Sequence, residues 1–138
     1  MTKLTITNGF DTENSARGLL AIDRVRSVEV EALVDTGATT LCLPEDVVKA
    51  LGLREINRRK VKLADGSIRE MSNVTGAFIE ILGRGMSCDA LVTPAGTTPL
   101  IGQIPLEALD LVVDPKSRDV HVNPASPDMP LLDLMLAS

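Results

Sequence analysis

The sequence has few aromatic residues: its 138 residues include two Phe and no Trp or Tyr. Proteins that bind single-stranded nucleic acid usually stack the bases on aromatic rings. Phosphate binding also needs a basic surface, whereas this chain carries a formal net charge of -5. We therefore expect no nucleic-acid partner, and we expect a core built from Leu, Val, Ile and Ala.

Histidine and cysteine are also scarce. His121 is the single histidine, and Cys42 and Cys88 do not have the spacing of metal ligands. We therefore expect no metal site and no cofactor. In a reducing compartment the two cysteines are expected to be small buried hydrophobic residues rather than a disulfide. A catalytic triad built on His121 stays open at this point, although no nucleophile-elbow motif lies beside it.

Long hydrophobic runs are absent. The first residues contain no apolar signal-peptide segment, and no run is long enough to span a bilayer, so we predict a cytoplasmic protein with no membrane partner. A chain of this length with 44% hydrophobic residues favours one domain. The composition shifts at Pro124 to a stretch with three prolines and then several leucines. We predict a domain over residues 1–123 and a tail over residues 124–138, whose leucines pack on a dimer surface or partner groove, or form a substrate-like segment.

One stretch, residues 32–40, reads Ala-Leu-Val-Asp-Thr-Gly-Ala-Thr-Thr. The apolar triplet is typical of a buried strand, and the residues after it form a turn signal. Such a strand would deliver the carboxylate of Asp35 to the floor of a cleft. Gly37 would leave room for a second backbone to come close.

The remaining pattern predicts an all-β fold with one or two short helices. Short helices are expected to begin at Pro44 and Pro105, the first ending at Gly52. Asp65-Gly66 between β-rich flanks predicts a hairpin with a two-residue turn. The expected strands are an edge strand before Asn8, a hairpin of residues 18–22 with 28–34, the two sides of the Asp65-Gly66 hairpin, and residues 76–82, 87–92, 111–113 and 120–122.

An internal repeat appears when the chain is shifted by 58 positions. Residues 32–34 then fall on the identical triplet at residues 90–92, and Thr39-Thr40 falls on Thr97-Thr98. Ala50-Leu51 falls on Ala108-Leu109, and Gly18 on Gly76. Each half is predicted to form a hairpin, a loop and a short helix. The second copy has Thr93 where the first has Asp35, so the carboxylate is present once.

Three motifs carry a family resemblance: residues 33–39 around Asp35, the Leu100-Ile101-Gly102 element ahead of a short helix, and the Asp65-Gly66 hairpin between them. Over residues 18–122 the chain resembles the retropepsin-like aspartic proteases, single-domain relatives of pepsin, and in particular their bacterial members. The resemblance implies a closed acid-protease β-barrel with an internal pseudo-two-fold repeat. It also implies a symmetric homodimer in which each protomer supplies one Asp35.

The resemblance assigns roles to individual residues. Asp35 would be the catalytic acid and base, Thr36 would brace the two loops across the dimer, Gly37 and Ala38 would line the substrate, Thr39 would hydrogen-bond the outer carboxylate oxygen, and Ala64, Asp65, Gly66 and Ser67 would form a lid over an extended peptide. Asp65 near the tip of this lid would disfavour acidic substrates or pair with a basic one.

The chemistry of peptide hydrolysis supports the same assembly. One ionised carboxylate must take a proton from water while a neutral one polarises the carbonyl, and two close carboxylates share a proton. Since Thr93 takes the second position, one chain does not supply the pair, and a C2 dimer does so most simply. We predict an aspartic endopeptidase acting on peptides or proteins. The alternative is a non-proteolytic dimerisation or binding module with the same fold.

Overall fold

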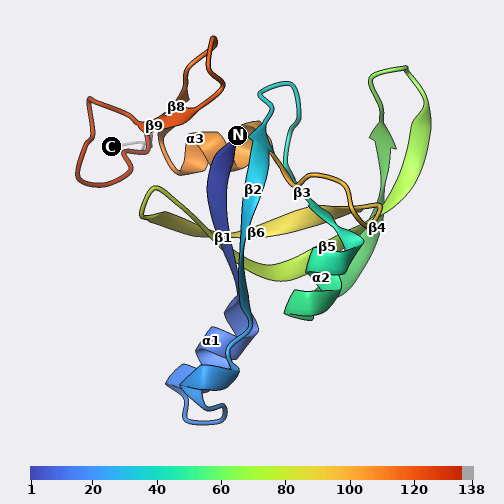
Figure 1. The fold of residues 1–138 in the computed structure, drawn as a ribbon, viewed down its shortest axis with the longest axis vertical. Coiled ribbons are helices and arrows are strands. Elements are labelled where there is room, and N and C mark those ends of the chain that lie inside the picture. The colour runs from blue at the N-terminus through green and yellow to red at the C-terminus, as the bar shows by residue number, and fades with distance from the viewer. Residues whose placement is uncertain (135–138) are drawn as a thin grey trace.

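A computed structural model describes residues 1–134 as a small barrel of strands with short helices at its ends (Figure 1). The strands are β1 (Thr2–Asn8), β2 (Ser27–Val34), β3 (Leu41–Pro44), β4 (Arg54–Lys62), β5 (Ile68–Ile81), β6 (Arg84–Thr93), β7 (Leu100–Ile101), β8 (Leu111–Val113) and β9 (Val120–Val122). The helices are α1 (Gly9–Ala16), the 3-10 helix η1 (Ile22–Arg24), α2 (Glu45–Leu51) and α3 (Gln103–Ala108). In the described part of the chain, no helix is both long and apolar enough to cross a membrane.

Six strands close into a barrel. Their order is β1-β2-β7-β3-β6-β5, and β1 pairs with β5 as well as with β2, which closes the ring. β4 pairs only with β5 and extends the sheet as a hairpin, while β8 and β9 form a separate two-stranded sheet. The all-β prediction and the closed barrel are therefore confirmed, but the first strand is not an edge strand.

The core is aliphatic, as the composition predicts. Its fully buried side chains include Leu4, Ile6, Leu41, Leu43, Leu51, Ile79, Ile81, Ile101 and Leu109. Burying one such side chain contributes about 1.5–3 kcal/mol. Both phenylalanines lie at the surface, and both cysteines are free and half-buried. Side chains alternate between the core and solvent along the strands. The inward-facing aliphatic side chains fill a barrel of this size without aromatic residues.

The internal repeat is visible in the strand register. β2 and β7 are parallel and pair Leu33 with Leu100, while β3 and β6 are parallel and pair Cys42 with Leu91. A shift of 58 positions converts the first pair into the second. β3 and β7 meet antiparallel at Cys42 and Leu100, which are each other's counterparts, so the pseudo-two-fold axis passes between them. The repeat is confirmed for the unit strand, loop, strand, helix.

The repeat does not extend back to residues 18–22. These residues form a turn and the start of η1 instead of a strand, with Leu19 and Ile22 exposed, so the predicted hairpin is wrong. The place beside β2 is already filled by β1, which pairs along it from Thr2 opposite Ala32. A helix that the sequence analysis does not predict follows the first strand, because the Asn8 side chain accepts the Asp11 N–H and caps α1.

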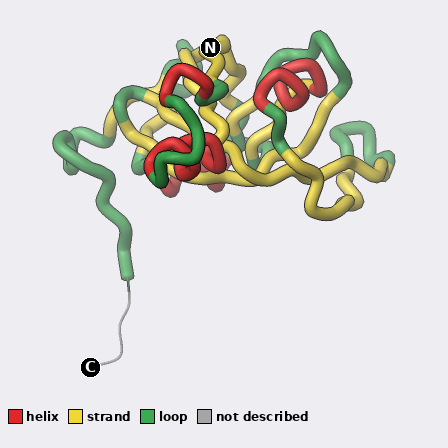
Figure 2. The backbone as a smooth tube through the Cα atoms, turned by 90° about the horizontal axis from the view of Figure 1, so that it is seen from below, coloured by secondary structure: helices red, strands yellow, loops and turns green. Residues whose placement is uncertain are grey.

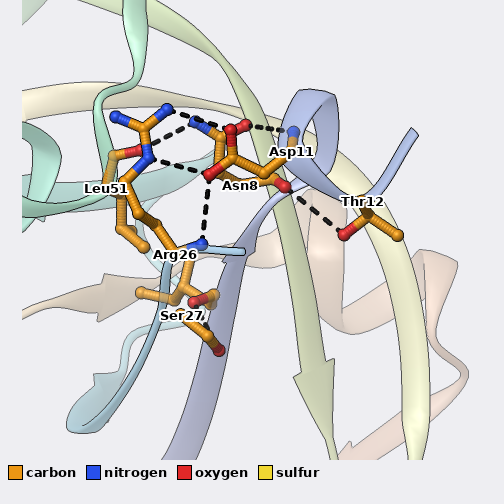
Figure 3. Close-up of polar contacts among 7 residues, drawn as sticks. Asn8, Asp11, Thr12, Arg26, Ser27 and Leu51 are labelled. Atoms are coloured by element: carbon orange, nitrogen blue, oxygen red, sulfur yellow. Dashed lines mark hydrogen bonds and ion pairs between the residues drawn. The ribbon is translucent and has the colours of Figure 1, made fainter. Parts of the chain in front are cut away.

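A polar cluster fastens α1 to the barrel (Figure 3). The Asn8 side chain donates to the Leu51 carbonyl at 2.7 Å. The buried carboxylate of Asp11 accepts the Arg26 Nε–H at 2.8 Å and an Nη2–H at 3.0 Å, a bidentate pair. These side-chain hydrogen bonds from Arg26 lower the pKa of Asp11. Gly52 ends α2 in a left-handed conformation. The guanidinium of Arg26 occupies the space that a side chain at Gly52 would need.

A second polar cluster holds the beginning of the predicted tail. The buried Arg84 guanidinium donates to the carbonyls of Leu109, Asp110 and Ser126. The Asp110 carboxylate accepts the Ser126 hydroxyl, the Asn123 amide at 2.9 Å and the Leu131 N–H at 3.0 Å. Beyond these contacts the last described residues extend away from the barrel (Figure 2). The division at residue 124 stays a proposal, and residues 135–138 of this tail lie outside the described residues.

Gly102 lies where two passages of the chain cross. An ideal Cβ at this position would lie 2.5 Å from the Thr40 carbonyl oxygen, 2.6 Å from the Thr40 nitrogen and 2.7 Å from the Ala38 carbonyl oxygen. Its φ of -94° is ordinary, so space and not backbone conformation requires glycine here. The loop after β2 therefore depends on the missing side chain.

Gly102→Ala should lower the free energy of unfolding by about 3 kcal/mol, the upper end of the cost of overpacking, because the atoms it meets are backbone. Denaturant titration followed by circular dichroism measures the loss. Gly66→Ala is the control: nothing lies within 4 Å of its Cβ, so only its positive φ costs stability, about 1 kcal/mol. Equal losses in the two variants would contradict the steric argument.

Asp110→Asn should lower the midpoint temperature by a few degrees at neutral pH. The hydroxyl of Ser126, the amide of Asn123 and the Leu131 N–H lower the pKa of Asp110 to about 2. A lowered pKa means that the ionised carboxylate stabilises the fold fully above its ordinary value of 3.8 and loses this effect as the pH falls towards 2. Thermal melts between pH 2 and 7 should show the difference shrinking, and the exposed Asp128→Asn should show none. A difference that is constant down to pH 2 would refute the explanation.

Candidate active site

The loop that carries Asp35 is held from both sides by β7 and α3. The Asp35 N–H donates to the Ile101 carbonyl at 3.0 Å, at the end of β2. Further along, the Gln103 N–H donates to the Ala38 carbonyl at 2.8 Å, and the Ile104 N–H donates to the Thr39 carbonyl at 2.9 Å. Two carbonyl groups of the loop thus accept hydrogen bonds from the start of α3, and these bonds fix the loop backbone around Gly102.

The Asp35 carboxylate has one oxygen engaged and one available. Its Oδ1 accepts the Gly37 N–H at 2.9 Å, and its own carbonyl accepts the Ala38 N–H at 3.2 Å. Among residues 1–134 no group donates a hydrogen bond to Oδ2. Burial, and next the charge of Asp35, raise the pKa of the Cys42 thiol. A half-buried acid with a fixed backbone and a free oxygen can take part in proton transfer.

The other predicted residues of the loop are exposed or half-exposed. Thr36, Gly37 and Thr39 are exposed, and Ala38 is half-buried. The hydrogen bonds of the described residues include none from the Thr39 hydroxyl to Asp35, so its supporting role stays a prediction. The exposed face of this loop leaves the Thr36 hydroxyl free to contact another molecule.

The second copy of the loop lies at the other end of the barrel. β2 is parallel to β7, β7 is antiparallel to β3, and β3 is parallel to β6, so β2 and β6 run in opposite directions. Leu33 and Leu91 lie in one row of paired residues that crosses β2, β7, β3 and β6. From this row the chain runs in opposite directions to Asp35 and to Thr93, so these two positions lie about 13 Å apart along the strands alone. Thr93 bonds Thr97 at 2.7 Å between hydroxyls in this second loop. Even an acid at Thr93 would be too far from Asp35 to share a proton.

The predicted lid is the loop between β4 and β5. The Gly66 N–H donates to the Leu63 carbonyl at 2.9 Å, and Gly66 has a φ of 85°. The turn is therefore a β-turn followed by a left-handed glycine, and not the two-residue turn that the sequence predicts. Asp65 Oδ1 accepts both the hydroxyl (2.6 Å) and the N–H (2.9 Å) of Ser67, and these bonds lower the pKa of Asp65.

The lid and the Asp35 loop project from the same side of the barrel in Figure 1. In residues 1–134, no hydrogen bond or ion pair joins residues 64–67 to residues 35–40. A hollow of about 610 Å³ runs between the hairpin, α2 and the end of β6, and one of about 510 Å³ lies beside α1. Neither hollow is lined by Asp35.

Two apolar side chains flank the Asp35 loop and were not identified from the sequence as part of the site. Leu33 is 36% exposed and Ile104 is 51% exposed. Leu33 pairs with Leu100, and Ile104, in the first turn of α3, donates its N–H to the Thr39 carbonyl. The signal for Ile104 was available, because it is an apolar residue two positions after the glycine of the Leu100-Ile101-Gly102 motif. These side chains present exposed apolar surface beside the loop that carries Asp35.

A comparison with known proteins bears directly on this site. A family model described as aspartyl protease matches residues 24–104, which include the Asp35 loop, the hairpin and Gly102. No curated protein matches the chain. The matched segment covers more than half of the chain, and the structure is the closed, mostly β barrel that this resemblance implies. The chain therefore belongs to the aspartyl protease family, as a retropepsin-like member.

Proposed function

We propose that this protein is an aspartic endopeptidase whose active site contains the Asp35 carboxylates of two protomers in a homodimer. The observation that carries the proposal is the position of Asp35. It lies in a firmly bonded loop at the end of β2, and among residues 1–134 no group donates a hydrogen bond to its Oδ2. Family membership supports the reaction class, and this geometry supports a site completed by a second copy.

The proposed reaction needs two carboxylates that share one proton. The ionised carboxylate takes a proton from water, and the resulting hydroxide adds to the carbonyl carbon while the neutral carboxylic acid gives its proton to the carbonyl oxygen. The tetrahedral intermediate then breaks its C–N bond, and the nitrogen leaves with a proton from the pair. The titration that controls this cycle belongs to both carboxylates together.

The homodimer is supported by what one chain does not provide. The repeat offers Thr93 at the equivalent position, on a strand that runs in the opposite direction. The exposed apolar side chains of Leu33 and Ile104 lie beside the Asp35 loop, where burial against a partner or substrate would be favourable. A two-fold axis close to Asp35 would bring both carboxylates and both Thr36 hydroxyls together.

The remaining assignments belong to the same proposal. Gly37 and Ala38 would contact the substrate backbone, and Thr39 would support the carboxylate. The loop of Ala64, Asp65, Gly66 and Ser67 would close over an extended peptide, with Gly66 supplying the backbone freedom that closure needs. The peptide would add to the hairpin by strand-like hydrogen bonds.

Asp35→Asn should lower peptide cleavage by a factor on the order of 10³ or more, because the amide cannot exchange the proton. The assay is mass spectrometry of a degenerate peptide mixture after incubation at several pH values. The exposed Asp23→Asn variant should cleave as the wild type does. Persistent cleavage by pure Asp35→Asn protein would refute the role of this carboxylate. Wild-type protein that cleaves no peptide would favour the non-proteolytic binding module.

Mixing wild-type and Asp35→Asn protomers should reveal the shared site. After subunit exchange at equal concentrations, the activity per wild-type chain should fall to about half, because half of the wild-type chains then sit in mixed dimers with one acid. Sedimentation of each protein alone checks that both are dimers. Activity per wild-type chain that does not change on mixing would show that one chain is sufficient.

A further inference from the structure

The β8–β9 hairpin is a sheet of two strands, and no other strand of residues 1–134 pairs with either of them. A pair of strands is at best marginally stable on its own, and this pair packs one of its faces on the barrel. The buried side chains of Leu111 and Val120 lie on that face, in the aliphatic core. Val112 and its cross-strand partner His121 lie on the other face and are exposed. Both edges of this small sheet are therefore open to a further strand.

The pairing of β8 with β9 shows which backbone groups point out of the free edge. The Asp114 N–H donates to the Asp119 carbonyl, so these two residues form a hydrogen-bonded pair at the end of the ladder. Such pairs alternate with non-hydrogen-bonded ones in antiparallel strands, so Val112 belongs to the next hydrogen-bonded pair. The N–H and C=O groups of Leu111 and Val113 therefore point away from β9, and among residues 1–134 they have no hydrogen-bond partner.

β8 is joined to the Asp35 loop by one short helix. α3 begins where the N–H groups of Gln103 and Ile104 donate to the loop, and it ends two residues before β8. The β8–β9 hairpin and the Asp35 loop project from the same side of the barrel (Figure 1). A molecule that meets the carboxylate from this side is therefore also placed to meet the β8–β9 hairpin.

Exposed apolar side chains continue from the Asp35 loop to this hairpin. Met1 directly precedes β1, whose register with β2 places it opposite the exposed Leu33. The amino group of Met1 lies 3.9 Å from the carboxylate of Asp119, in the turn between β8 and β9. The apolar surface beside the carboxylate thus does not end at the loop, and Val112 extends it onto the hairpin.

We propose that the free edge of β8 pairs with its own copy, across the two-fold axis that brings the two Asp35 carboxylates together. The inference rests on the homodimer of the proposed function and names the contact that assembles its site. A two-fold axis perpendicular to a sheet makes the two edge strands antiparallel and keeps both barrels on the same side of the sheet. The result is one four-stranded sheet in the order β9-β8-β8-β9, with both Asp35 loops on the side of the barrels.

The outward groups of β8 determine the register of this contact. When Leu111 faces Val113 of the partner subunit, each N–H of the two residues meets a carbonyl, and the symmetric arrangement contains four hydrogen bonds. The new ladder ends at these residues for two reasons. Asp110 has a φ of 54°, which turns the chain out of the strand, and the Asp114 carbonyl accepts the Arg118 N–H within the turn.

The side chain at the centre of the contact distinguishes the two edges of the hairpin. In this register Val112, which is 44% exposed in one chain, meets Val112 of the partner subunit as an apolar cross-strand pair. The same symmetry at the edge of β9 would place the polar His121 against its own copy, which removes water from both rings without an apolar contact in return. β8 is also the strand that follows α3 directly. These observations favour β8.

Val112→Cys should form a disulfide between protomers. The central pair is a non-hydrogen-bonded one with Cα atoms about 4.5 Å apart, which is within the range that a disulfide spans. The protein is equilibrated in a glutathione buffer, and mass spectrometry of the unreduced digest identifies the linked residue. His121→Cys is the matched control, because it lies opposite Val112 on the same exposed face and should stay unlinked. An unlinked Val112→Cys protein, or equal linking of both variants, would overturn the proposal.

Val113→Pro removes an outward N–H but no donor of the β8–β9 ladder. The dissociation constant of the dimer, measured by sedimentation, should rise about tenfold or more, because two hydrogen bonds between protomers are lost. Val122→Pro is the control, since this residue is also half-buried and its N–H points out of the edge of β9. Circular dichroism checks that both variants fold. An equal rise in the two variants, or none in Val113→Pro, would contradict the pairing of β8.

Activity separates this contact from the proposed reaction. The disulfide-linked Val112→Cys dimer should cleave peptides, and its activity per chain should stay constant on dilution, whereas that of the wild type should fall as its dimer dissociates. A linked dimer that cleaves nothing supports the β8 contact and refutes the endopeptidase function. An active wild type whose Val112→Cys variant stays unlinked overturns the β8 contact alone.

Discussion

The structure depends on one crossing of the chain, where the loop after β2 passes over Gly102. Three backbone atoms of residues 38 and 40 occupy the space that any side chain at this position would need. The crossing lets Ile101, Gln103 and Ile104 bond the loop from both sides, so that Asp35 is held by main chain alone. A carboxylate positioned in this way needs no supporting side chains from the core. This explains how a barrel with an aliphatic core can fix the backbone that carries Asp35.

The barrel and the β4–β5 hairpin depend on different kinds of interaction. The barrel fixes the acid by steric fit and by backbone hydrogen bonds, which depend little on charge. The hairpin is a free edge with exposed side chains, and its ion pairs at Arg58 lie towards its base. A substitution towards the tip of the hairpin therefore leaves the backbone hydrogen bonds that hold Asp35 in place. The Arg26–Asp11 pair adds stability at the end of the barrel that carries α1.

The sequence predicts best those features that are encoded locally. The Asp35 loop, the helix from Glu45 to its end at Gly52, and the repeat were all predictable, because each depends on short motifs or on identical residues at a fixed shift. The stretch at residues 18–22 was mispredicted because its apolar residues resemble a strand. In the structure the position beside β2 is taken by β1, through a long-range pairing. β7 has two residues, too few to show a strand periodicity, so the sequence marked it as part of a motif and not as a strand. The faces of the β4–β5 hairpin required the register, which a bulge between Glu55 and Asn57 shifts.

The antiparallel course of β2 and β6 has a consequence for how such a chain can have arisen. Duplication of one strand–loop–strand–helix unit gives two equivalent loops, but the barrel directs them to opposite ends. Only one of them can meet its own copy across a single two-fold axis. The other is released from that demand, and in this chain a pair of threonine hydroxyls and the Asp46 side chain hold it in place. In this sequence the acid is present in the first copy of the loop, and the second copy has Thr93 in its place.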